Sequence, residues 1–223
     1  MPLPCFRLTY FVNGSSALRI VGIENTKPMF PRILKRYTPS KRGKPTIQTI
    51  PGDAVNALLR KEIHILCHGC NEFLIWGSGI AGWLAGCLPK HYPTVATVSC
   101  KEQRIKGPAL RGRCFVNRVS HNTWLANLYT QEGIKSAKNP KPFKRALFVK
   151  ALKELAKDLV KLRRSTYPYH IERGEPIRIA MPIIGAGLGG GTPEEFFSAL
   201  AEWKIPESVG EVQVIVYAPY VPA

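Results

Sequence analysis

The sequence predicts a three-layer α/β/α fold with a mixed, largely parallel sheet, and three observations lead to it. Strand-like segments alternate with helical ones along most of the chain, an order that places a sheet between two layers of helices. Two glycine-rich turns each join a buried strand to a helix. The chain has 223 residues, 45% of them apolar, which suits one compact domain with an appendage.

Residues 1–45 are expected to form an N-terminal extension. The apolar, β-branched segments 5–12 and 17–24 flank the turn sequence Asn-Gly-Ser-Ser at 13–16, which predicts a β-hairpin. The rest of the extension is rich in proline and basic residues, a composition that argues against a helix. The main domain is then expected to span residues 46–223.

Seven segments of the main domain have the short, apolar and β-branched character of strands. They are expected at residues 46–50, 63–67, 94–98, 113–119, 124–129, 177–183 and 212–218.

Four further segments predict helices. They are expected at 54–60, 77–88, 143–162 and 193–203. Residues 143–162 carry apolar side chains at the spacing of one helix face, which predicts a long amphipathic helix. Pro89 is expected to stop the helix before it, and Glu194 and Glu195 suit the start of the last helix because their charges oppose its dipole.

The two glycine-rich turns carry the clearest chemical signal. The first consists of Trp76, Gly77, Ser78, Gly79, Ile80 and Ala81. The second begins with Gly185, Ala186, Gly187, Leu188 and Gly189 and continues to residue 191. Glycine lets backbone N–H groups approach an anion closely, and the following helix adds a favourable dipole.

Two such turns in one chain predict a cleft that grips a diphosphate from both sides, because ligands of open α/β sheets gather beyond the carboxyl ends of the strands. Neither turn has the Lys-Ser/Thr pair that closes a P-loop. For either turn taken alone, a plain tight turn is the simpler interpretation.

The charge of the chain is unusual, with 32 Lys and Arg against 15 Asp and Glu and a formal net charge of +17. Basic residues gather in the stretches 32–44 and 135–164. Such an excess attracts anions, and three interpretations stay open: a nonspecific nucleic-acid contact, steering of a phosphorylated small molecule, or solubility. A solvated basic face without a specific partner is the alternative to all of them.

Six cysteines, at positions 5, 67, 70, 87, 100 and 114, predict free thiols in a reducing compartment. Cys67 and Cys70 have C-x-x-C spacing, but no second pair completes a zinc site, so no metal and no cofactor are expected. A membrane span needs about 18 apolar residues in a row, and no such run occurs. We therefore expect a cytoplasmic protein, and a monomer.

Four segments together resemble the macrodomain superfamily, and in particular its stand-alone ADP-ribose-1″-phosphate phosphatases. They are Ile50-Pro51-Gly52-Asp53; His68-x-Cys70-Asn71 followed by Trp76-Gly77-x-Gly79-Ile80-Ala81; Ala126-Asn127-Leu128 with Gln131; and the run from Met181 to Gly190. The likeness covers roughly residues 46–223. It implies a macrodomain-like sheet and a cleft for ADP-ribose or ADP-ribose-1″-phosphate.

The resemblance also implies roles for single residues. Asp53 would accept the adenine amino group, Asn71 would hold the distal ribose, and Tyr217 or Tyr220 would cover the adenine. The two glycine-rich turns would line the diphosphate. His68 would be the catalytic residue that removes the terminal phosphate, since a histidine can act as base, acid or nucleophile near neutral pH; a core histidine that ends a strand is the alternative.

The function expected from these residues is that of a phosphoric monoester hydrolase acting on ADP-ribose-1″-phosphate. A non-catalytic ADP-ribose-binding module is the first alternative, and an ADP-ribosyl hydrolase is the second. A macrodomain branch that cleaves ADP-ribosyl esters has an aspartate where this chain has Gly189, which argues against that route. Hydrolysis assisted by the substrate phosphate and a bound water stays open.

Overall fold

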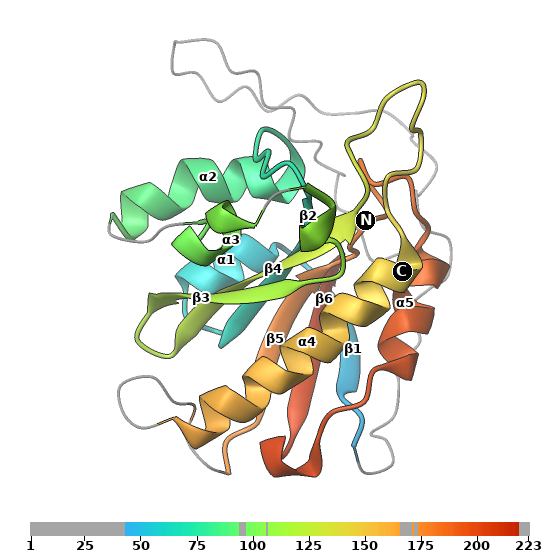
Figure 1. Cartoon of the computed structure of the whole chain (residues 1–223). Helices are drawn as coiled ribbons and strands as arrows, with labels where there is room; N and C mark the ends of the chain where they lie inside the picture. The colour runs from blue at the N-terminus through green and yellow to red at the C-terminus, as the bar shows by residue number, and fades with distance from the viewer. Residues whose placement is uncertain (1–42, 94–96, 106, 166–170, 172–173, 219–223) are drawn as a thin grey trace, which may run out of the picture.

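The computed structural model describes residues 43–93, 97–105, 107–165, 171 and 174–218. The hairpin expected at 5–12 and 17–24 lies outside the described residues, and so does Tyr220. Within the described part, a six-stranded sheet lies between two layers of helices (Figure 1). The α/β/α arrangement expected from the sequence is confirmed.

The sheet has the strand order β1-β6-β5-β2-β4-β3. Its members are β1 (Thr46–Pro51), β2 (Ile65–Asn71), β3 (Cys114–Ser120), β4 (Thr123–Gln131), β5 (Ile177–Pro182) and β6 (Val212–Ala218). All neighbours pair in parallel except β3, which runs antiparallel to β4. The carboxyl ends of five strands therefore meet at one edge of the sheet.

Helices cover both faces of the sheet (Figure 1). One face carries α1 (Ala54–Leu59), α2 (Gly79–His91) and α3 (Cys100–Arg104), and the other carries α4 (Arg145–Arg164) and α5 (Pro193–Glu202). Two short 3-10 helices span Gly107–Leu110 and Glu207–Val209. No helix in the described part of the chain is long and apolar enough to cross a bilayer.

The larger core lies beneath α4 and α5, and its formation follows from the spacing of apolar residues along α4. Phe148, Leu152, Leu155 and Leu159 recur every three or four positions and are all buried. A smaller cluster, which includes Leu58 and Leu84, packs α1 and α2 on the opposite face. Both faces are thus covered, as a parallel sheet requires.

Three expected elements differ from the structure. The strand expected at 63–67 runs from Ile65 to Asn71, because pairing with β4 keeps the polar sequence after Cys67 extended. The helix expected to stop at Pro89 continues to His91, since a proline in the last turn removes only one backbone donor. The strand expected at 94–98 is not formed at its described residues: Thr97 and Val98 form a bend.

Candidate functional site

The carboxyl edge of the sheet brings the sequence-predicted residues together. Asp53 follows β1, Asn71 ends β2 and Tyr217 lies near the end of β6. The first glycine-rich turn (residues 76–81) follows β2, and the second (residues 185–191) follows β5. His68 lies farther from this edge, within β2.

The two turns face each other across this edge. A Cβ atom built on Gly79 would lie 3.8 Å from Cδ1 of Leu188, whose side chain is 54% exposed. A Cβ atom built on Gly77 or on Gly187 would meet no atom within 4 Å. These two glycines therefore leave backbone open to an approaching group, one in each turn.

The buried ring of Phe143 explains why two other positions of the second turn are glycine. A Cβ atom built on Gly185 or Gly191 would lie within 2.5 Å of that ring, so only glycine fits there. The backbone N–H of Phe143 also donates to the carbonyl of Gly189 at 3.0 Å. This aromatic anchor was not identified from the sequence, because nothing local links the start of α4 to a loop some forty residues later.

The side chain of Asn71 holds together the loop that precedes the first turn. The Oδ1 atom of Asn71 accepts from the N–H groups of Phe73 at 3.0 Å and Ile75 at 3.2 Å, and its Nδ2 atom donates to the Ile75 carbonyl at 2.9 Å. A contact between Asn71 and a ribose stays a prediction. A ribose hydroxyl would have to share the Asn71 amide with the backbone of this loop.

Asp53 is the N-cap of α1. Its Oδ1 atom accepts from the backbone N–H groups of Val55 at 2.7 Å and Asn56 at 3.1 Å. Tyr217 stands beside it, since a Cβ atom built on Gly52 would lie 3.3 Å from Cδ1 of the tyrosine ring. A carboxylate and an aromatic ring, both half-buried, thus flank the carboxyl ends of β1 and β6.

His68 is fully buried. Its Nε2 atom lies 2.8 Å from Oδ1 of Asn127, and its ring meets the ring of Trp76 edge-on at 4.7 Å. Burial lowers the pKa of His68 to about 4, so the ring is neutral at pH 7. The histidine was expected to end its strand; it lies within β2, beneath the loop that leads to the first turn.

Two buried polar residues next to His68 were not identified as site residues from the sequence. Asn127 of β4 and Glu102 of α3 are both completely buried, and Asn127 donates to Glu102 at 2.7 Å. The spacing Ser99-x-x-Glu102 has the pattern of a helix capping box, and α3 has that cap. The pattern could have located the helix start, but not the contact with β4.

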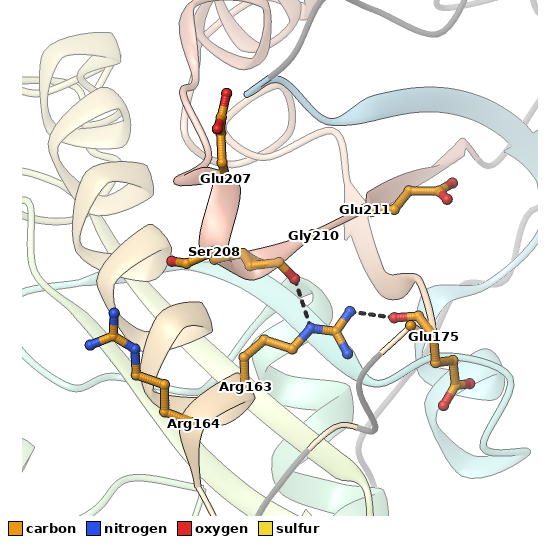
Figure 2. Close-up of a pocket in the computed structure, with 9 residues that line it drawn as sticks. Arg163, Arg164, Glu175, Glu207, Ser208, Gly210 and Glu211 are labelled. Atoms are coloured by element: carbon orange, nitrogen blue, oxygen red, sulfur yellow. Dashed lines mark hydrogen bonds between the residues drawn. The ribbon is translucent and has the colours of Figure 1, made fainter.

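A separate depression of about 360 Å³ lies far from this edge, where α4 ends and β6 begins (Figure 2). Arg163 crosses it and donates to the carbonyls of Val209 at 2.7 Å, Ile171 at 3.3 Å and Glu175. The guanidinium holds three chain segments together. The other charged groups of the lining are of both signs: Arg164, Glu175, Glu207 and Glu211. The depression thus has no clear preference for an anion or a cation.

Comparisons with known proteins support the fold. Neither a family model nor a curated protein sequence matches the chain. Among solved structures, the macrodomain of Mycobacterium tuberculosis DarG is similar at 21% identity, with a TM-score of 0.54 over 79% of this chain and 99% of that one. The macrodomain of Thermus aquaticus DarG is similar at 21% identity, with a TM-score of 0.52 over 78% and 98%.

A third similar structure is Thermosipho africanus DarTG in complex with ADP-ribose, at 13% identity and a TM-score of 0.50, covering 79% of this chain and 43% of that one. At these identities the similarities show the fold alone. The expected macrodomain-like architecture is confirmed.

Proposed function

We propose that this chain, which has a macrodomain fold, binds ADP-ribose at the carboxyl edge of its sheet and releases phosphate from ADP-ribose-1″-phosphate. The observation that carries the proposal is the pair of facing turns, each with one glycine, Gly77 or Gly187, open to an approaching group. Backbone N–H groups at a helix start suit an anion, and the first turn leads directly into α2; the net charge of +17 also attracts an anion.

The proposed ligand follows the order of the strands. The adenine would lie by Asp53 and Tyr217, the diphosphate between the two turns, and the distal ribose by Asn71. Oδ1 of Asp53 caps α1, whereas its other oxygen has no hydrogen-bond partner among the described residues and could accept from the adenine amino group. The ADP-ribose bound to the similar Thermosipho protein supports this class of ligand.

His68 is the proposed catalytic residue. A neutral imidazole suits a general base, which would take a proton from the attacking water, or a nucleophile, which would form a phosphohistidine that water then cleaves. In either case the bond between phosphorus and the ribose oxygen breaks. Because Trp76 covers the ring, the loop at 72–78 has to move away from His68 before the ring can touch a substrate.

Binding without turnover is the second candidate, and the complete burial of His68 favours it. One pair of measurements separates the two candidates: calorimetric titration with ADP-ribose, and phosphate release from ADP-ribose-1″-phosphate. His68→Gln keeps a donor toward Asn127 and should abolish phosphate release while ADP-ribose still binds. Phosphate release by this variant at the wild-type rate would remove His68 from the mechanism. If the wild-type chain binds ADP-ribose but releases no phosphate, the phosphatase is excluded and the chain is a binding module.

A further inference from the structure

A buried carboxylate stands two hydrogen bonds away from His68. Glu102 is completely buried in α3 and forms no salt bridge with any described residue. Its oxygens instead receive five hydrogen bonds. Oε1 accepts from Nδ2 of Asn127 at 2.7 Å and Oη of Tyr129 at 3.0 Å, and Oε2 accepts from N of Ser99 at 2.6 Å, Oγ of Ser99 at 2.7 Å and Nδ2 of Asn117 at 2.9 Å.

Glu102 and the carbonyl of Thr97 together determine which way the Asn127 amide points. The Nδ2 atom of Asn127 lies 2.7 Å from Oε1 of Glu102 and 2.8 Å from the carbonyl oxygen of Thr97. A carboxylate and a carbonyl only accept hydrogen bonds, so the amino group of the amide has to lie between them. The oxygen of the amide, Oδ1, therefore faces His68.

The amide in turn determines where the proton sits on the imidazole. Oδ1 of Asn127 lies 2.8 Å from Nε2 of His68, and an amide oxygen only accepts. Nε2 therefore carries the hydrogen, and in the neutral ring Nδ1 keeps its lone pair. Sγ of Cys70 lies 3.8 Å from Nδ1 and 3.7 Å from Nε2, so this thiol does not distinguish the two ring nitrogens. Burial holds the pKa of the thiol well above its usual range, so it stays protonated.

We propose that Glu102 is a positioning residue that fixes His68 in the Nε2–H tautomer through Asn127, which leaves Nδ1 as the only ring atom that can act on a substrate. The assignment of the tautomer stands on the hydrogen-bond geometry alone. Its consequence for catalysis rests on the proposed function.

The variant Glu102→Gln should reverse the orientation of the Asn127 amide. The backbone N–H of Ser99, 2.6 Å from Oε2, has to donate, so the glutamine oxygen takes that place and its amino group faces Nδ2 of Asn127. Two donors then oppose each other. Asn127 relieves the conflict by turning its amide over, which presents Nδ2 to His68 and moves the ring proton to Nδ1, although the carbonyl of Thr97 opposes the turn.

Nitrogen-15 NMR of the histidine ring measures the tautomer directly, with the full chain at pH 7. The wild-type chain should show the Nε2–H form at His68, and folded Glu102→Gln should show a population of the Nδ1–H form. An Nδ1–H ring or a charged ring in the wild type overturns the proposal even where the variant fails to fold. An unchanged tautomer in folded Glu102→Gln overturns it as well.

Two control variants separate positioning from a loss of stability. Glu195→Gln alters the equivalent capping box of α5, where the carboxylate has no link to His68, and should leave the tautomer unchanged. Tyr129→Phe removes a donor to Glu102 without touching the link between Asn127 and His68, and should lower stability but keep the Nε2–H form. A change of the His68 tautomer in either control variant contradicts the proposal that Glu102 acts on His68 through Asn127.

Phosphate release then tests the catalytic consequence. Glu102→Gln should lower kcat by about a hundredfold, the lower end of what a positioned acid or base contributes, while the Kd for ADP-ribose stays the same. A wild-type kcat in a variant whose tautomer has changed overturns the role of Nδ1. If the wild type itself releases no phosphate, the proposed reaction fails, whereas the NMR result still decides whether Glu102 sets the tautomer.

Discussion

The indole of Trp76 covers the imidazole of His68 edge-on, with ring centroids 4.7 Å apart and ring planes at 74°. Trp76 begins the first glycine-rich turn and His68 lies within β2, so this turn packs directly against the buried histidine. A ligand that displaces this loop would expose the ring. In the proposed function, ligand binding and exposure of His68 would be coupled through this aromatic contact.

Removal of this cover should raise the pKa of His68. Desolvation by burial is the largest cause of its lowered value of about 4, and water admitted by Trp76→Ala would stabilise the charged ring. We expect the pKa to move toward 6.5, the ordinary value for histidine, as measured by NMR titration. Trp76→Phe keeps a ring over the imidazole and should change the pKa less; an equal shift in both variants would contradict the covering role.

Acid should destabilise the chain through the same histidine. The pKa of His68 is about 4 in the folded chain, against 6.5 for a histidine exposed to water, so the folded state binds fewer protons than the unfolded state between these values. The contribution of the neutral ring is complete above pH 6.5 and is lost as the pH falls toward 4, by up to about 3 kcal/mol. Urea unfolding at pH 7 and pH 4.5 measures this loss.

His68→Gln is the control for that measurement, because glutamine does not titrate. His64, whose pKa is also lowered by burial, is present in both chains, so the difference between them isolates His68. If both chains lose the same free energy of unfolding between pH 7 and pH 4.5, His68 is not the group responsible.

Local patterns predicted most of the order of the elements, but α3 (Cys100–Arg104) was not expected and the strand expected at 94–98 is not formed at its described residues. The apolar spacing along residues 143–162 predicted the helix that is α4 (Arg145–Arg164), and the two runs of glycine predicted turns after β2 and β5. The meeting of these turns also followed, since parallel strands bring their carboxyl ends to one edge. Each of these inferences needs only residues close in sequence and one rule of topology.

Contacts between distant segments could not be predicted in this way. The sequence gives no sign that Phe143 supports the turn at 185–191, or that Glu102 reaches Asn127 on β4. The continuation of β2 through His68 depends on pairing with β4, which overrides a polar, glycine-containing sequence. The histidine is therefore buried where the sequence suggested a strand end.

Asp53 should have two separable roles, one in the fold and one in binding. Asp53→Ala removes the N-cap of α1 and should lower the free energy of unfolding by about 1 kcal/mol, and it should weaken ADP-ribose binding by about 1–3 kcal/mol. Asp53→Asn keeps an oxygen for the cap but presents an amino group to the adenine amine. It should therefore bind ADP-ribose weakly while unfolding like the wild type.

Urea unfolding and calorimetric titration of the two Asp53 variants check this division. Binding by Asp53→Asn at wild-type affinity would exclude the proposed adenine contact. Equal stability of Asp53→Ala and the wild type would exclude a significant contribution of the cap.

Substitution by alanine should destabilise the fold at one glycine of the second turn but not at another. A methyl group at Gly189 would lie 2.7 Å from the carbonyl oxygen and 2.9 Å from the Cα of Gly185, and 3.0 Å from the Cβ of Phe143, so backbone would have to shift to admit it. Gly189→Ala should therefore lower the free energy of unfolding by about 1–3 kcal/mol. A methyl group at Gly187 meets no atom within 4 Å, so Gly187→Ala should unfold like the wild type.

The variant that keeps its stability, Gly187→Ala, should instead bind ADP-ribose more weakly. In Gly187→Ala the methyl group stands where the proposed diphosphate approaches the backbone, and we expect the Kd for ADP-ribose to rise at least tenfold, which corresponds to about 1.4 kcal/mol. Calorimetric titration of the folded variant measures it. Unchanged affinity in Gly187→Ala would mean that nothing approaches the turn at this point, and the diphosphate would then have to lie elsewhere than between the two turns.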